Sequence, residues 1–181
     1  MRRRTIGLAA ALALAAAPQS ALARSEKSWG DASSIGRDAL VAAALAVPAF
    51  QGDWHGDLQA GESMAGALAI TAGLKEAIPE WRPDHSDRKS FPSGHTSVSF
   101  AAAASLHNRY GWRVGVPAQL VAAFVGFSRV EARKHHWYDV VAGAAIGETS
   151  GFLLTSKHDA SVRILPWGGT DGAGMVLSTR F

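Results

Sequence analysis

The stretch WYDVVAGAAIGETSGFLLTS, residues 137–156, is apolar and carries Gly143, Gly147 and Gly151 at every fourth position. Residues four apart lie on the same face of an α-helix, so this spacing puts three small residues on one face. Such a face lets a second helix approach closely. The stretch therefore predicts a helix that packs tightly against another helix.

Four further stretches predict helices over residues 38–47, 62–77, 96–110 and 116–128, with prolines confining the charged segment 79–92 to a loop. The expected fold class is all-α. It is a helical bundle of about five core helices that occupies residues 36–160. Two strand-like segments flank the turn Gly-Gly-Thr-Asp-Gly within residues 161–181, and they predict a short C-terminal β-hairpin that caps the bundle.

The N-terminus has the pattern of a secretory signal peptide. Three arginines at positions 2–4 precede an apolar run at 6–17, and Ala21-Leu22-Ala23 supplies a small-x-small cleavage signal. The alternative is an uncleaved anchor, although the run is shorter than the roughly 20 residues that a span needs. We therefore expect removal of residues 1–23, a polar linker over 24–35, and export to the periplasm.

Composition narrows the function classes. The 181 residues contain no cysteine, which excludes disulfide frameworks, thiolate metal sites and cysteine nucleophiles. The net charge of +3 comes from the three arginines of the expected signal peptide, so a nucleic-acid partner is not expected. The predicted helices are short, and Glu148 interrupts the longest one. This favours a soluble bundle, or one with peripheral membrane contact, over a polytopic membrane protein. No feature predicts an oligomeric state.

The segment Pro92-Ser93-Gly94-His95 opens the helix predicted at 96–110. Ser93 can cap that helix, and Gly94 lets the backbone approach a ligand without a side-chain clash. The free N–H groups at a helix start favour an anion. A bound phosphate would stabilise protonated His95, which suits a proton donor. The alternative is an ordinary N-cap beside a surface histidine.

A second group lies before the last helix. It consists of Arg129, His135 and Asp139, and His135 and Asp139 are four residues apart. A carboxylate at this spacing can accept one imidazole N–H and leave the other nitrogen free as a nucleophile. A structural Asp–His pair is the alternative. His136 lies three residues from Asp139, so geometry alone leaves both histidines open.

The remaining candidates supply charge. Lys75 ends one predicted helix, and Arg82 precedes a proline in the loop that follows. Either residue alone fits an ordinary solvated cation. Together with Arg129 they make three cations, and phosphoryl transfer spreads negative charge over three oxygens that need such partners. Asp53, His55 and Asp57 alternate as ligand-type residues but match no established metal-ligand spacing, so no metal site is predicted.

In order, the motifs are Lys-x6-Arg-Pro, Pro-Ser-Gly-His and Ser-Arg-x5-His-x3-Asp. This order resembles the signature of the phosphatidic acid phosphatase type 2 / vanadium haloperoxidase superfamily. Every signature position is filled within residues 75–139: Lys75, Arg82, Pro83, Pro92, Ser93, Gly94, His95, Ser128, Arg129, His135 and Asp139. One departure is the loop between Pro83 and Pro92, which is shorter than usual for the family.

The resemblance implies a phosphatase that forms a phosphohistidine. It selects His135 as nucleophile, His95 as general acid and Asp139 as the group that orients His135. Phosphate would be bound by three cations, a hydroxyl and a backbone N–H, namely those of Lys75, Arg82, Arg129, Ser93 and Gly94.

The fixed cations make a metal unnecessary in this interpretation, and no cofactor is expected. The substrate would be a phosphorylated small molecule, isoprenyl compound or lipid, with vanadate as an inhibitor. Two alternatives remain. One is a vanadate-dependent haloperoxidase, in which vanadate is the cofactor, and the other is a non-catalytic anion-binding protein of the envelope.

Overall fold

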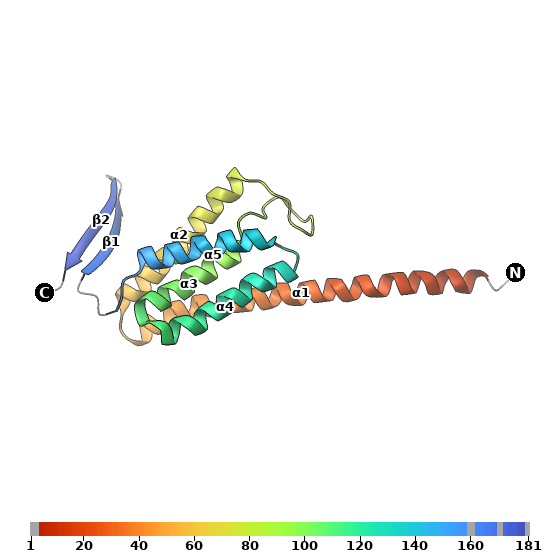
Figure 1. Ribbon diagram of the computed structural model, residues 1–181, viewed down its shortest axis with the longest axis horizontal. Helices are drawn as coiled ribbons and strands as arrows, with labels where there is room; N and C mark the ends of the chain where they lie inside the picture. The colour runs from red at the N-terminus through yellow and green to blue at the C-terminus, as the bar shows by residue number, and fades with distance from the viewer. Residues whose placement is uncertain (1–3, 159–161, 170–171, 180–181) are drawn as a thin grey trace.

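The computed structural model describes residues 4–158, 162–169 and 172–179 (Figure 1). Within these residues five helices form a bundle, which confirms the all-α class. They are α1 (Arg4–Phe50), α2 (Trp54–Ala77), α3 (Gly94–Tyr110), α4 (Trp112–Glu131) and α5 (Trp137–Leu154). Helix α3 lies at the centre and packs against all four others. Its alanines at 101–104 are fully buried, and their small side chains let the surrounding helices come close.

Helices α3 and α5 lie close together, with the glycine face of α5 against α3. A Cβ atom on Gly147 would lie 2.3 Å from the carbonyl oxygen of Ser97 and 2.7 Å from the Cβ of Phe100. One turn earlier, a Cβ on Gly143 would lie 2.6 Å from the carbonyl oxygen of Ser93. Any side chain would push α5 away from the start of α3, so these glycines set the distance between the two helices.

Helix α1 differs from the expectation at its N-terminal side. Residues 24–35, predicted as a linker, are helical and continuous with the rest of α1, whose first part projects beyond the bundle (Figure 1). Ser33 is fully buried, and its hydroxyl accepts a hydrogen bond from Arg129 of α4. The polar, serine-rich composition therefore reflects contacts with a polar site rather than a flexible connection. Cleavage after residue 23 stays a prediction.

Helices α1 to α4 are also longer than predicted, whereas α5 ends two residues before the predicted end at residue 156. For example, α2 has 24 residues and α4 has 20, because Asp53 caps α2 by accepting the N–H of Gly56, and Gly111 turns the chain directly into α4. In the described chain, the part of α1 from Ser25 to Phe50 is long and apolar enough to cross a membrane, with a mean hydropathy of 1.2. That criterion rests on length and composition, which a signal sequence or a buried core helix also satisfies.

A buried ion pair closes the end of the bundle at which α2 begins. Asp53 accepts hydrogen bonds from the guanidinium of Arg109, at the end of α3, and from Tyr110 at 3.0 Å. His158 Nδ1 lies 3.0 Å from the same carboxylate. Arg109 is buried, so this pair joins α2, α3 and the segment after α5. Asp53, one of the three alternating ligand-type residues, thus has a structural role at this end of the bundle.

Beyond α5, strand β1 (Val162–Gly169) pairs antiparallel with β2 (Gly172–Thr179), in a register that places Val162 opposite Thr179. The strand pair lies past the end of the bundle (Figure 1). The turn of the predicted hairpin falls on residues 170 and 171, which lie outside the described residues.

The α3–α5 contact yields a stability prediction. We expect Gly147→Ala to lower the free energy of unfolding by about 2 kcal/mol, because the new methyl group collides with backbone atoms that cannot move independently. Gly61→Ala in α2 is the matched control, since nothing lies within 4 Å of its Cβ position. There alanine's helix propensity should stabilise the fold by up to about 1 kcal/mol. Equal effects of both changes in thermal unfolding would contradict the close packing.

Candidate active site

All three predicted motifs meet at one end of the bundle. Helices α2 and α4 end there and α3 and α5 begin there, so the loops at 78–93 and 132–136 lie together (Figure 1). The carboxylate of Asp139, in the first turn of α5, is fully buried between them. Its Oδ2 accepts the Ser90 hydroxyl at 2.5 Å and the backbone N–H of His136 at 2.8 Å. Burial alone would raise the pKa of Asp139, but the adjacent His135 ring and hydrogen bonds from Ser90 and His136 lower it to about 2.

His135 lies between this carboxylate and a cation. Its Nδ1 is 3.5 Å from Asp139 Oδ2, and its Nε2 is 3.4 Å from Arg82 Nη1. The side chain is 2% exposed, and burial together with Arg129 and Arg82 lowers its pKa to about 4 despite the opposing effect of Asp139. The ring is therefore neutral at neutral pH. With the proton on Nδ1 facing Asp139, the lone pair on Nε2 faces the cations and is available as a nucleophile.

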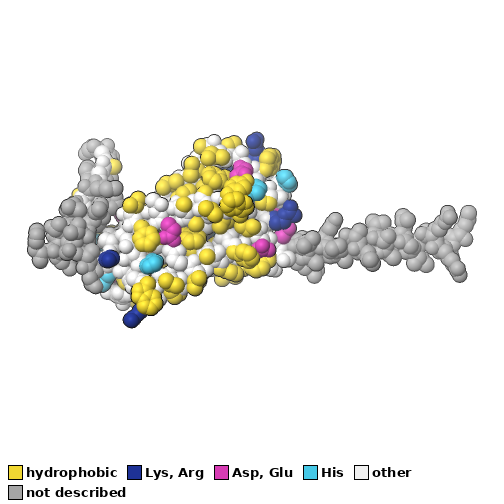
Figure 2. Space-filling view, in the orientation of Figure 1, with side chains coloured by type: hydrophobic (Ala, Val, Ile, Leu, Met, Phe, Trp, Pro, Cys, Tyr) yellow, Lys and Arg dark blue, Asp and Glu magenta, His cyan; other side chains and the backbone are white. Residues whose placement is uncertain are grey.

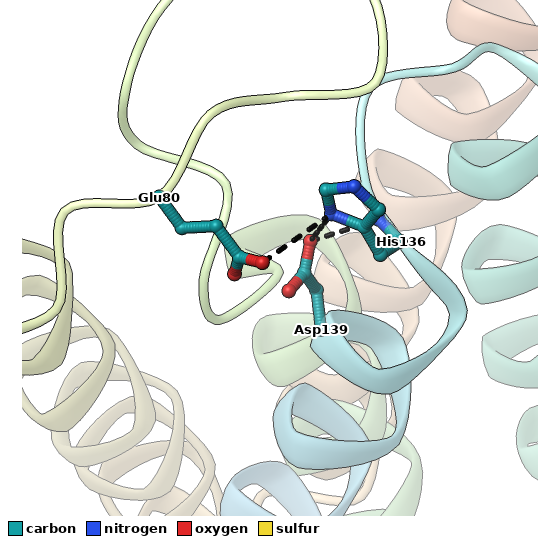
Figure 3. A group of neighbouring side chains, drawn as sticks. All are labelled: Glu80, His136 and Asp139. Atoms are coloured by element: carbon teal, nitrogen blue, oxygen red, sulfur yellow. Dashed lines mark hydrogen bonds and ion pairs between the residues drawn. The ribbon is translucent and has the colours of Figure 1, made fainter.

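His136 contacts the same carboxylate from outside. Its Nδ1 is 3.4 Å from Asp139 Oδ2 and 3.8 Å from Glu80 Oε1, as Figure 3 shows. Its ring stacks on Tyr138 with 5.0 Å between centroids. The side chain is 32% exposed and faces an acid rather than the arginines. Burial and charge therefore separate the two histidines, which spacing alone could not do.

Glu80, His136 and Asp139 also form a group whose ligand atoms lie within 4.8 Å of one another, close enough to hold a metal ion (Figure 3). One oxygen of each carboxylate in the group has a partner already, because Glu80 Oε1 accepts the Tyr138 hydroxyl and Asp139 Oδ2 accepts Ser90, whereas Asp139 Oδ1 has no hydrogen-bond partner among the described residues. A cation would have to displace these bonds. The contacts account for the group as a support for the start of α5, and the expectation of no metal site stays a prediction.

Arg129 is the most enclosed of the predicted phosphate-binding cations. It is 8% exposed, and its Nη1 donates to Ser33 Oγ at 3.3 Å. Its Nε is buried without a hydrogen-bond partner among the described residues. Burial, with Arg82 and Arg37 nearby, lowers its pKa to about 10, which leaves it charged. A buried guanidinium with an unused donor is well suited to an anion.

Arg82 and Lys75 are held differently. Arg82 Nε donates to Asp87 Oδ1 at 2.7 Å and its Nη1 to the Lys134 carbonyl at 3.0 Å. Lys75 Nζ donates to the carbonyl oxygens of residues 89, 90 and 92, at 2.7, 3.3 and 2.6 Å. Burial and Arg82 lower the pKa of Lys75 to about 8. All three N–H groups of Lys75 are thus used by the loop before α3.

Ser93 and Gly94 lie where α3 begins. Ser93 is buried, its N–H donates to the Asp139 carbonyl at 3.0 Å, and its Oγ accepts Thr96 Oγ1 at 2.9 Å. Its side chain makes no capping bond to the helix, contrary to the expected N-cap role. A Cβ on Gly94 would meet only the Thr71 methyl, at 3.7 Å. Protein packing therefore leaves room at Gly94.

His95 contacts residues of α1 that sequence reasoning missed. Its Nε2 lies 3.0 Å from Arg37 Nη1 and 3.3 Å from Ser34 Oγ. Burial, Arg129 and Arg37 lower the pKa of His95 to about 3. No motif marks Arg37, and the predicted helix began just after it. An extension of that helix would have placed Ser33 and Arg37, four residues apart, on one face.

Comparisons with known proteins agree on one family for this chain. The sequence profile of the PAP2 superfamily matches residues 57–163. The lipid A 1-phosphatase of Porphyromonas gingivalis is 38% identical over 96 residues, which are 51% of this chain and 21% of that protein. The chain thus matches about a fifth of that relative's length.

Two crystal structures resemble the fold. That of LpxE from Aquifex aeolicus has a TM-score of 0.61 and 20% identity, and the match covers 71% of this chain and 84% of the other. That of the transmembrane PAP2-type phosphatidylglycerolphosphate phosphatase from Bacillus subtilis has a TM-score of 0.56 and 25% identity, covering 76% and 84%.

The two buried histidines predict how stability depends on pH. Their folded-state pKa values, about 3 for His95 and about 4 for His135, lie below the ordinary value of 6.5. The unfolded chain therefore binds more protons than the folded one below pH 6.5, and stability must fall as the pH is lowered. We expect Tm to drop between pH 6.5 and 5, where the carboxylates stay ionised. Added inorganic phosphate should reduce the drop.

His95→Gln is the matched variant, because glutamine keeps a polar side chain but does not titrate. Its Tm should depend less steeply on pH over the same range. An unchanged slope would show that His95 is not held neutral in the fold.

Proposed function

This chain belongs to the PAP2 superfamily, and we propose on that basis that it is a phosphatase that forms a phosphohistidine on His135. One observation carries the proposal. A buried, neutral histidine has one nitrogen on the Asp139 carboxylate and the other beside Arg82, with the unused Nε of buried Arg129 in the same cluster of cations. That arrangement suits attack on a bound phosphoryl group.

In the first step, His135 Nε2 attacks phosphorus, and the bond to the leaving oxygen breaks. Asp139 stabilises the charge that develops on the ring and holds it in line through Nδ1. Arg82 and Arg129 neutralise the phosphoryl oxygens, assisted by the first N–H groups of α3. Lys75 contributes its charge and holds the loop that carries Ser90.

His95 is the proposed proton donor, although it is neutral in the unliganded site. A phosphate dianion bound beside it would favour the imidazolium form and raise its pKa again. Binding of substrate thus charges the acid that the reaction needs. Water then attacks the phosphohistidine, and His95 accepts a proton from that water, which returns the site to its starting state.

The fixed cations take the part that metal ions play in many phosphoryl-transfer enzymes, so we propose a metal-independent reaction. The substrates we propose are phosphorylated lipids, as the names of the two relatives above suggest, or isoprenyl compounds, as the name of a decaprenylphosphoryl-5-phosphoribose phosphatase suggests. Substituting vanadate for phosphate in the same site would give the haloperoxidase alternative.

A location at a membrane on the exported side fits these substrates. Large apolar side chains on the outer face of α4 are exposed, with Leu120 at 67%, Phe124 at 45% and Phe127 at 53%. Figure 2 shows apolar side chains spread along the visible face of the bundle. Such a surface is more extensive than a soluble monomer usually exposes. Fractionation of cells with and without detergent tests this part of the proposal.

The central test uses a chromogenic phosphomonoester in the presence of a chelator. We expect His135→Ala to reduce kcat by about a thousandfold or more and His95→Ala by about a hundredfold or more, with vanadate inhibiting the wild type. His136→Ala is the matched control and should keep most of the activity.

Three outcomes would contradict the proposal. The first is full activity of His135→Ala, and the second is loss of activity when metals are chelated. The third is bromide oxidation that needs vanadate and peroxide in the absence of any phosphate release, which would favour the haloperoxidase.

A further inference from the structure

A cleft of about 600 Å³ opens at the end of the bundle opposite the candidate active site. Its walls include His107 near the end of α3, Trp112 at the start of α4 and Lys157 after α5. A volume of this size is typical of sites that hold a small ligand. Helix α3 separates the two ends, and at 1.5 Å per residue its 17 residues span about 25 Å. The cleft is therefore too far from His135 to be part of the active site.

The wall that follows α5 is fixed to α3. Asn108 Nδ2 donates a hydrogen bond to the carbonyl oxygen of Thr155, and Arg109 Nη1 donates to that of Ser156 at 3.0 Å. The backbone N–H of His158 donates to the Arg109 carbonyl at 3.1 Å. These bonds hold the segment after α5 in place without a ligand. The cleft is thus a preformed feature of the fold.

Two exposed cations lie at the cleft. Lys157 lines it and makes no hydrogen bond or ion pair with the residues that the structure describes. The guanidinium of Arg113 lies 5.7 Å from the centre of the Trp112 ring and forms no ion pair within the described chain. Figure 2 shows basic and histidine side chains at this end of the bundle, away from the projecting part of α1. The cleft therefore offers positive charge to a ligand.

Two carboxylates of the described chain interact with the cleft lining, and both have partners of their own. Asp53 is paired with Arg109 and lies beside His158. Glu148 of α5 is half-buried and interacts with Gln119 and His107. Neither acid contacts the two exposed cations, which remain available to an anion.

An exposed apolar stripe begins at the cleft and runs along α4. It consists of Trp112, Val116, Leu120 and Phe124, which follow one another at intervals of four residues and are all exposed. Residues four apart share one face of a helix, so the four side chains form a continuous line. Phe152, on the opposite wall of the cleft, is exposed as well. A ligand that fits the cations and the stripe has an anionic head group and a hydrocarbon chain.

We propose that the cleft binds the phosphodiester head group of an anionic phospholipid, with an acyl chain lying on the apolar stripe of α4. Lys157 and Arg113 pair with the phosphate, and the Trp112 ring covers the apolar part next to the head group. The lipid is a ligand here and not a substrate, because the proposed nucleophile His135 lies at the other end of α3. The inference therefore goes beyond the proposed reaction and does not depend on it.

The test measures how added phosphatidylglycerol raises the Tm of the full-length protein in a neutral detergent, since a ligand that binds only the folded state stabilises it. Phosphatidylcholine tests the need for net negative charge, and deacylated glycerophosphoglycerol tests the need for acyl chains. We expect phosphatidylglycerol to act at concentrations about tenfold below those of either comparison compound. Lys157→Gln and Arg113→Gln should each require about fivefold more phosphatidylglycerol for the same rise in Tm.

Arg88→Gln is the matched control, because Arg88 is an exposed arginine whose guanidinium also lies 5.7 Å from a tryptophan ring, that of Trp81, at the active-site end. It should respond to phosphatidylglycerol as the wild type does. Tm values without lipid show whether each variant folds normally.

Three results would overturn the inference. The first is an equal loss of response in Arg88→Gln and Arg113→Gln, which would indicate diffuse electrostatic attraction. The second is an unchanged response in both Lys157→Gln and Arg113→Gln. The third is an equal effect of phosphatidylcholine, or of the head group alone, on the wild type.

Discussion

The arrangement of the active site depends on one buried carboxylate, that of Asp139. Its side chain accepts the Ser90 hydroxyl and the N–H of His136, and its own carbonyl accepts the N–H of Ser93. One residue thus ties the loop before α3, the start of α3 and the start of α5 together. A buried charge is tolerated only when it is paired and hydrogen-bonded, so these bonds and the position of His135 are interdependent.

The packing of α5 against α3 determines where the Asp139 carboxylate lies. Gly143 and Gly147 let α5 lie against the first turns of α3 with backbone atoms almost in contact. Larger side chains would separate the two helix starts, and Asp139 could no longer reach Ser90 and Ser93. The same close packing removes water from His135, which is why its pKa falls and its lone pair stays available. The small residues of α3 and α5 therefore account both for the close contact of the two helices and for the burial that lowers the pKa of His135.

Much of this could be predicted from the sequence, because glycine spacing and ordered motifs are local patterns. They predict five helices, a close approach of another helix to the glycine face of α5 and the convergence of three motifs, and the family that they resemble is confirmed. The predictions that failed concern features that depend on contacts between residues far apart in the sequence. The segment 24–35 is helical because Ser33 meets Arg129 across the bundle, and Arg37 reaches His95 from 58 positions away. No local pattern records such pairs, and the helix lengths do not follow from local spacing either. The distances along the chain to Asp139 leave both His135 and His136 open, and only the family motif selects His135.

The cations of the site divide into two kinds by the partners that they already have. Lys75 donates all three N–H groups to loop carbonyls. In the proposed reaction it would act on phosphate through its charge and keep its hydrogen bonds to the loop. Arg129 is more deeply buried than Lys75 but keeps an unused Nε, so it has a donor available for an incoming anion. A site that holds several like charges in a poorly hydrated space is destabilised until an anion arrives. In the proposed reaction, binding of a phosphoryl group would relieve that repulsion and charge His95 in the same event, which would couple recognition of the anion to activation of the acid.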